Sequence, residues 1–118
     1  MSEISITFKT EKIFRNFCGV YTHKTLTDLL IWFSENFDEP HVTSSYRQDD
    51  PGVHGSTPLR GIDVRSYIYN KPQVIVENIN KAWIYDPDRP EKLCAIFHNV
   101  GYGAHIHLQV HENTRKIL

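Results

Sequence analysis

Three side chains of this sequence have the chemistry of a metal-binding set: His54, Asp63 and His107. A catalytic zinc site takes three protein ligands, often neutral imidazole and carboxylate, and leaves a fourth position for water or substrate. Each residue taken alone has an ordinary explanation, because a loop histidine is usually exposed and a strand aspartate often pairs with an arginine such as Arg65. Together they predict one zinc site, provided that the fold brings them within coordination distance.

The last of these residues lies in a segment where polar and apolar residues alternate. The segment runs His105, Ile106, His107, Leu108, Gln109, Val110 and His111. In a β-strand the side chains alternate between the two faces, so the histidines and Gln109 would share one face and the apolar residues the other. An isolated pair of such histidines is more often a solvated polar face. The presence of His54 and Asp63 elsewhere in the chain favours the metal site.

The hydrophobic pattern predicts five strands and two helices that would position these residues. Short alternating or apolar segments predict strands over residues 4–8, 41–46, 61–66, 93–97 and 104–111. Apolar residues three and four positions apart predict a helix over Thr25–Phe37 and a second one from Pro72, with Ile75, Ile79, Ala82 and Trp83 as its apolar stripe and an end at residues 86–90. An irregular loop over residues 48–60 would carry His54, and residues 99–103 would form a hairpin-like connection.

Length and composition predict one soluble globular domain over residues 1–118. The sequence is 40% hydrophobic and 23% charged, as is usual for a folded domain. Its 13 Lys and Arg residues are balanced by 14 Asp and Glu residues, so it lacks the net positive charge that binds nucleic acids. We expect no membrane segment and, because the N-terminus has no signal-peptide pattern, synthesis in the cytoplasm.

The two cysteines are predicted to be free and buried. Cys18 and Cys94 lie in apolar surroundings, far apart in the sequence and without a Cys-x-x-Cys spacing. Free cysteine commonly behaves as a small core residue. Two buried thiols are therefore favoured over a disulfide.

The order of these motifs resembles a known enzyme family. Thr43-Ser-Ser-Tyr-Arg47, then His54, Gly61-Ile-Asp63-Val and His105-Ile-His107 are similar to motifs of the D-alanyl-D-alanine metallopeptidases, which are related to lysostaphin-type enzymes and to the hedgehog signalling domain. The resemblance covers roughly residues 41–111. It implies a compact α+β fold with an antiparallel sheet and two main helices, a zinc ion, and cleavage of peptide bonds in cell-wall peptidoglycan, often by bacteriophage lysis enzymes. A separately made membrane pore would then carry the protein to the cell wall.

By position in these motifs, the resemblance assigns roles to individual residues. His54, Asp63 and His107 match the metal ligands, and Arg47 matches an arginine that holds a substrate carboxylate. His105 matches the first position of the paired motif. The sequence departs from the family in two ways: His54 and Asp63 are nine positions apart rather than seven, so that the loop must bulge, and no Glu or Asp stands just before the last ligand to act as general base.

The mechanism expected from these residues is metal-assisted hydrolysis. His105 would accept a proton or stabilise the oxyanion, although a role in orienting the site is an equally good explanation. Arg47 and Arg60 are candidates for binding a peptide carboxylate, and both could instead form surface ion pairs. The remaining candidate histidines are expected to be structural or exposed: His41, His98 and His111.

Two other functions remain open at this point. The first is a non-catalytic protein of the same fold that keeps zinc for stability or peptide binding, which the missing carboxylate base and the altered loop would permit. The second is a metal-free structural component of a phage particle, in which the histidines form an ordinary polar strand face. Metal content and peptidoglycan cleavage would distinguish these functions.

Overall fold

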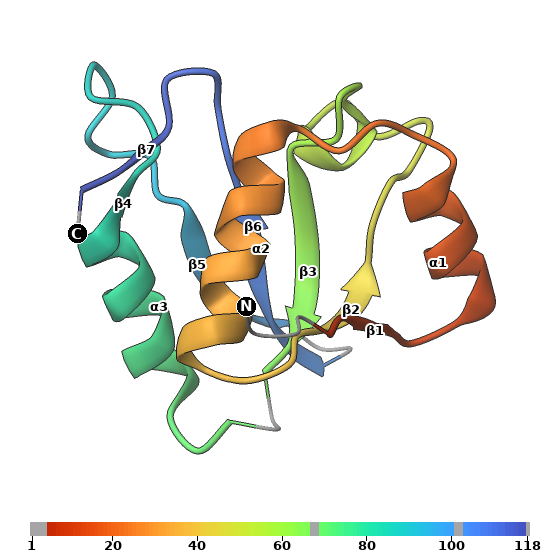
Figure 1. Cartoon of the computed structure of the whole chain (residues 1–118), viewed down its shortest axis with the longest axis horizontal. Helices are drawn as coiled ribbons and strands as arrows, with labels where there is room; N and C mark the ends of the chain where they lie inside the picture. Colours follow the sequence, from red (N-terminus) through yellow and green to blue (C-terminus); the bar gives the residue numbers. More distant parts are fainter. Residues whose placement is uncertain (1–4, 67–68, 101–102, 118) are drawn as a thin grey trace.

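The largest element of the fold is a five-stranded sheet in the order β1-β2-β3-β6-β5 (Figure 1). The computed structural model describes residues 5–66, 69–100 and 103–117 of the chain. The strands are β1 (Thr7–Phe8), β2 (His41–Ser44), β3 (Gly61–Arg65), β5 (Ala95–Val100) and β6 (Gly103–Gln109). β1 is parallel to β2, and the other neighbouring pairs of this sheet are antiparallel. The predicted α+β class is confirmed as a small single domain with a mostly antiparallel sheet. Ile4 of the predicted first strand, and Gly101 and Tyr102 of the predicted connection, lie outside the described residues.

The described residues form three α-helices, one more than predicted: α1 (Glu11–Cys18), α2 (Lys24–Asn36) and α3 (Pro72–Ala82). α2 and α3 correspond to the two predicted helices, and proline at the start of α3 suits a first helical position. The hydrophobic pattern did not predict α1 because this helix is short and buries no side chain completely. Its start is fixed by Thr10, whose hydroxyl accepts a hydrogen bond of 3.2 Å from the backbone N–H of Ile13. None of these three helices is long and apolar enough to cross a membrane.

Helix α3 ends earlier than predicted. The helix was expected to include Trp83 and to end at residues 86–90, but Trp83 has an extended backbone and begins the short strand β4 (Trp83–Ile84). β4 pairs with β7 (Arg115–Lys116) in a separate two-stranded sheet, and the Ala82 carbonyl accepts a hydrogen bond of 2.7 Å from the N–H of Ile117. Pairing with a segment distant in sequence therefore overrides the local helical pattern.

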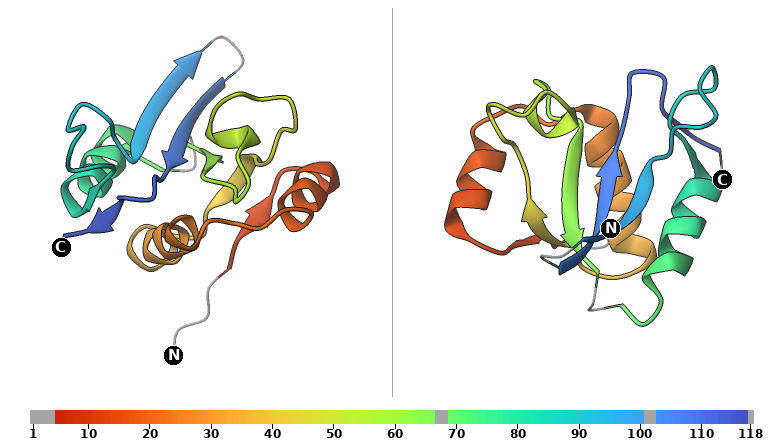
Figure 2. Two further views of the ribbon diagram at one scale, coloured as in Figure 1. Left: turned by 90° about the horizontal axis from the view of Figure 1, so that it is seen from above. Right: turned by 180° about the vertical axis from the view of Figure 1, so that it is seen from behind.

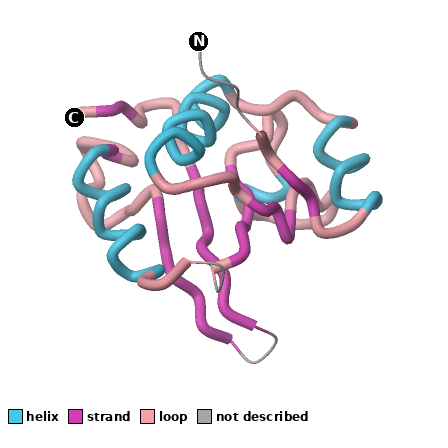
Figure 3. Tube along the Cα trace, turned by 60° about the horizontal axis from the view of Figure 1, so that its bottom comes forward, coloured by secondary structure: helices cyan, strands magenta, loops and turns pink. Residues whose placement is uncertain are grey.

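The two faces of the main sheet have different environments. α2 and α3 lie on one face, as both views of Figure 2 show. The apolar residues of β3 and β6 point to this face and are fully buried: Ile62, Val64, Ile106 and Leu108. Burying each such side chain stabilises the fold by about 1.5–3 kcal/mol. The opposite face carries the polar residues of the same strands and, above β3, the one-turn 3-10 helix η1 (Val53–Gly55), which is seen from another side in Figure 3.

The cysteine prediction is half wrong. Both thiols are free, and Cys94 is fully buried next to β5. Burial raises the pKa of the Cys94 thiol to about 12. Cys18, however, is exposed. It is the last residue of the unpredicted helix α1, which lies at the surface, so its apolar sequence neighbours did not indicate burial.

Candidate metal centre

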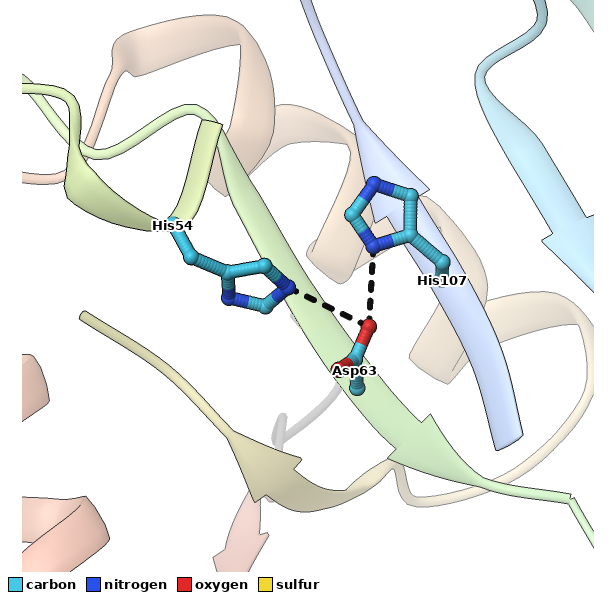
Figure 4. A group of neighbouring side chains, drawn as sticks. All are labelled: His54, Asp63 and His107. Atoms are coloured by element: carbon cyan, nitrogen blue, oxygen red, sulfur yellow. Dashed lines mark hydrogen bonds and ion pairs between the residues drawn. The ribbon is translucent and has the colours of Figure 1, made fainter. Parts of the chain in front are cut away.

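The three predicted ligands come together on the sheet face opposite α2 and α3 (Figure 4). Asp63 on β3 and His107 on β6 are direct cross-strand partners in the antiparallel register. Such partners have adjacent side chains on the same face. His54 reaches them from η1, within the loop that the longer spacing to Asp63 required. One potential ligand atom from each residue lies within 4.8 Å of the other two.

The two separations that involve Asp63 are close to what a small tetrahedral ion needs. His107 Nδ1 lies 2.8 Å and His54 Nε2 lies 3.3 Å from the same Asp63 oxygen, Oδ1. Ligands at about 2.0–2.2 Å from a tetrahedral zinc are about 3.4 Å apart. The three residues are buried, with exposed fractions of 5% for His54, 7% for Asp63 and 8% for His107. Only small shifts would convert these contacts into coordination.

The backbone fixes which nitrogen of His54 is free to bind a metal. His54 Nδ1 lies 2.8 Å from the backbone carbonyl oxygen of Ser45. A carbonyl oxygen only accepts hydrogen bonds, so Nδ1 carries the proton and donates it. In the neutral imidazole the lone pair then resides on Nε2, the nitrogen that faces Asp63. An outer hydrogen bond of this kind orients a metal-ligating histidine.

A relay through Gln109 fixes the opposite tautomer in His107. The amide nitrogen of Gln109 donates a 2.8 Å hydrogen bond to the Leu93 carbonyl, which leaves its Oε1 3.0 Å from His107 Nε2. Because Oε1 can only accept, His107 Nε2 is the protonated nitrogen. Its lone pair is therefore on Nδ1, next to Asp63 Oδ1.

The two tautomers place two nitrogen lone pairs around one carboxylate oxygen. Three electron-rich atoms in contact repel one another unless a cation lies between them. Without a metal, each nitrogen–oxygen contact needs its own proton, which makes both buried imidazoles cationic, whereas a single metal ion can bind all three atoms while the imidazoles stay neutral. The donor set of His54, Asp63 and His107 therefore fits a metal ion such as zinc.

Asp63 has the charge that a metal ligand needs. Burial alone would raise the pKa of its carboxyl group, but where His107 and His54 carry protons on the nitrogens that face it, in the absence of a metal, their hydrogen bonds and charge lower it by more. The net pKa lies well below its usual range. The carboxylate is thus ionised at neutral pH without loss of a proton on metal binding.

Two further histidines adjoin the three ligands. His105 Nε2 lies 3.7 Å from Asp63 Oδ2, the carboxylate oxygen that His54 and His107 do not contact. His98 is the cross-strand partner of His105, and its ring is stacked parallel to that of His107 at a centroid distance of 5.7 Å. Burial lowers the pKa of His98, and the nearby imidazoles of His105 and His107 lower it further. The sequence interpretation treated His98 as structural or exposed. The predicted strand ended at Phe97, one residue before His98, so the prediction did not include His98 in the sheet.

The two arginines proposed from the sequence lie in different places. Arg47 Nη2 is 3.2 Å from Asp50 Oδ2 in the loop before η1, with 53% of its side chain exposed. Its backbone N–H donates to the His54 carbonyl at 2.7 Å, so it belongs to the loop that carries the ligand. The Arg60 carbonyl accepts a hydrogen bond of 2.9 Å from the Val110 N–H, which extends the pairing of β3 with β6 by one residue. Strand alternation places the Arg60 side chain on the sheet face of Ile62 rather than on that of Asp63. The fold does not bring Arg60 to the three ligands.

Two of the other histidines, which the sequence interpretation treated as structural or exposed, have partners away from the three ligands. His41 Nδ1 lies 2.7 Å from the Thr7 hydroxyl. His111 packs its ring against Tyr85 at a centroid distance of 5.6 Å, and its Nδ1 is 3.8 Å from Asp86 Oδ2. Both residues therefore serve local structure.

The comparisons with known proteins identify no family. The sequence matches no family model, no curated protein is similar to it, and no solved structure matches its fold. The resemblance to the D-alanyl-D-alanine metallopeptidases therefore stays a prediction. The geometry of His54, Asp63 and His107 is the observation from which a function can be argued.

Proposed function

We propose that this protein is a zinc-dependent metallopeptidase that hydrolyses peptide bonds in bacterial cell-wall peptidoglycan. The observation that supports this proposal is the convergence of one carboxylate oxygen and two imidazole lone pairs whose outer nitrogens are already hydrogen-bonded. Two histidines and one carboxylate are a usual ligand set of catalytic zinc. Three protein ligands leave one coordination position for chemistry.

The residues around the ligands suit a hydrolytic role. Zinc held in such a site supplies Lewis acidity, which polarises a carbonyl group and makes water a better nucleophile at neutral pH. His105, on the same face of the sheet, would accept a proton from the attacking water or stabilise the developing oxyanion. Arg47, with an exposed guanidinium in the ligand loop, would bind a peptide carboxylate after leaving Asp50.

The substrate class comes from the resemblance of the sequence. The motifs from Thr43 to His107 are those that imply a hedgehog-like fold and a peptidoglycan peptide as substrate, often in phage lysis. The mostly antiparallel sheet and the positions of the three ligands in its central strands and the preceding loop are compatible with that fold. The cell wall would then be the site of action.

One observation favours a second function, a zinc-binding protein of the same fold without catalysis. In the described part of the chain, no Glu or Asp other than Asp63 makes a hydrogen bond or ion pair with His54 or His107. A carboxylate general base therefore has no counterpart among these contacts. In this alternative, chelation would lower the melting temperature but no peptide would be cleaved.

One experiment distinguishes these functions. Untreated protein is analysed for metal by mass spectrometry, and purified peptidoglycan is digested with and without chelator, followed by mass analysis of the fragments. We expect about one zinc per chain, with new fragments that are lost with chelator or in His107→Ala but kept in the control His41→Ala. Zinc without fragments would support the non-catalytic alternative, and protein without metal would contradict both.

A further inference from the structure

Gly61 lies on β3 two residues before Asp63 and on the same face of the sheet. The side chain of Val53 fills the space that a side chain at position 61 would take. A Cβ atom built on Gly61 would overlap Val53 Cγ2 and would lie 2.8 Å from Val53 Cβ. Carbon atoms in van der Waals contact are about 3.5–4.0 Å apart. The first residue of η1 therefore rests directly on the backbone of β3, at the one strand position that has no side chain.

A second glycine lets η1 approach the loop on its other side. A Cβ atom on Gly55 would overlap the carbonyl oxygen of Asp50 and would lie 3.0 Å from that of Arg47. The same turn is held by the hydrogen bond of 2.7 Å from the Arg47 N–H to the His54 carbonyl. η1 is thus confined between the turn at residues 47–50 and the surface of β3.

The contact between Val53 and Gly61 sets the distance from His54 to Asp63. His54 follows Val53 directly, and Asp63 follows Gly61 on the same face of β3. If Val53 rests over Gly61, the next residue of η1 reaches over Asp63, where His54 Nε2 lies 3.3 Å from Oδ1. A methyl group at position 61 would push η1 away by on the order of 1 Å. The nitrogen and the oxygen would then be too far apart to share one zinc.

We infer that Gly61 is a positioning residue of the metal centre. Because Gly61 has no side chain, Val53 of η1 can pack against β3, and this contact fixes the position of His54. The inference rests on the proposed metal site and deepens it: Asp63 and His107 are placed by strand pairing, whereas His54 is placed by this packing contact. A change at Gly61 should therefore weaken metal binding while the sheet remains folded.

Titration with cobalt(II) tests the inference, because the visible absorption of bound cobalt reports both affinity and ligand geometry. We expect Gly61→Ala to bind cobalt about 10- to 100-fold more weakly than the natural protein, the usual effect of disturbing the support of a metal ligand, and with an altered spectrum. Gly52→Ala is the matched control in the same loop, since its Cβ would approach one side-chain atom, Asp50 Oδ1 at 3.2 Å, and no backbone atom within 4 Å. Its affinity and spectrum should be unchanged.

An exchange of the two side chains separates positioning from stability. In the double variant Val53→Gly with Gly61→Ala, the methyl group at position 61 meets no side chain, so affinity and spectrum should return to near those of the natural protein. If Gly61→Ala is unfolded by circular dichroism, the double variant decides alone: recovery of both fold and affinity supports the inference, and recovery of fold without affinity overturns it. Natural affinity in a folded Gly61→Ala also overturns it. A natural protein that binds no cobalt refutes the metal site itself, which is a different result.

Discussion

The relay from Leu93 through Gln109 to His107 allows a direct test of the tautomers that were deduced from the structure. Replacing Gln109 by Met keeps a side chain of similar length and removes both of its hydrogen bonds, to the Leu93 carbonyl and from His107 Nε2. His107 then has no partner that holds the proton on Nε2 and the lone pair on Nδ1. Removing such an outer partner costs about 10- to 100-fold in metal affinity. This corresponds to about 1.4–2.7 kcal/mol at 25 °C.

Gln109→Glu is the matched variant that sharpens this prediction. Its carboxylate still accepts a hydrogen bond from His107 Nε2 and makes the imidazole a more basic ligand, as in carboxylate–histidine–zinc triads. We therefore expect Gln109→Glu to bind zinc at least as tightly as the natural protein, and Gln109→Met to bind it more weakly, in competition titrations against a chromophoric chelator. Equal affinity of Gln109→Met and the natural protein would show that Nε2 is not the donor and would refute the deduced tautomer.

Three other predictions concern the fold around the site. In the native protein Cys18 should react with a thiol reagent and Cys94 should not, so that titration counts one thiol before denaturation and two after it; two reactive thiols in native protein would contradict the packing around Cys94. Phe33→Ala, at a fully buried position, should lower the unfolding free energy by about 3–5 kcal/mol in urea titrations, while Phe14→Ala, at a position with an exposed fraction of 48%, should lower it far less. Because the folded-state pKa of Cys94 is raised to about 12, the unfolded chain loses this proton first as pH rises. The unfolding free energy should therefore fall above about pH 9, by up to about 1.4 kcal/mol per pH unit, and Cys94→Ala should remove this part of the decline.

The sequence pattern predicted the helices and strands that have one side in the core and the other side polar. In β3 and β6 the strict alternation of apolar and polar side chains assigned Asp63 and His107 to the face opposite Ile62 and Leu108, as the structure has them. The buried stripe of α2 was equally visible, because its apolar residues recur at helical spacing over a 13-residue helix. Periodicity is informative where one side of an element is buried along its whole length.

The features that the sequence did not reveal depend on contacts between distant segments. β4 exists because Arg115–Lys116 lies beside Trp83–Ile84. His98 joins the site through the register of β5 against β6, which was not fixed by the predicted strand ends. The contact of Val53 with Gly61 likewise follows from the packing of η1 on β3 rather than from any local pattern. The hydrogen bond of Gln109 with His107 also could not be read from the sequence.

The position of Asp63 and His107 as cross-strand partners means that the candidate centre has two parts of unequal rigidity. The backbone of both residues belongs to the ladder in the interior of the sheet, so these ligands can separate only if the sheet opens. His54 stands on a single helical turn whose attachment to β3 has no strand pairing. We therefore expect an ion to enter and leave by outward movement of this turn. Removal of the metal by a chelator should first increase the hydrogen-exchange rates of the amides around residues 47–55, while the amides of β3 and β6 stay protected.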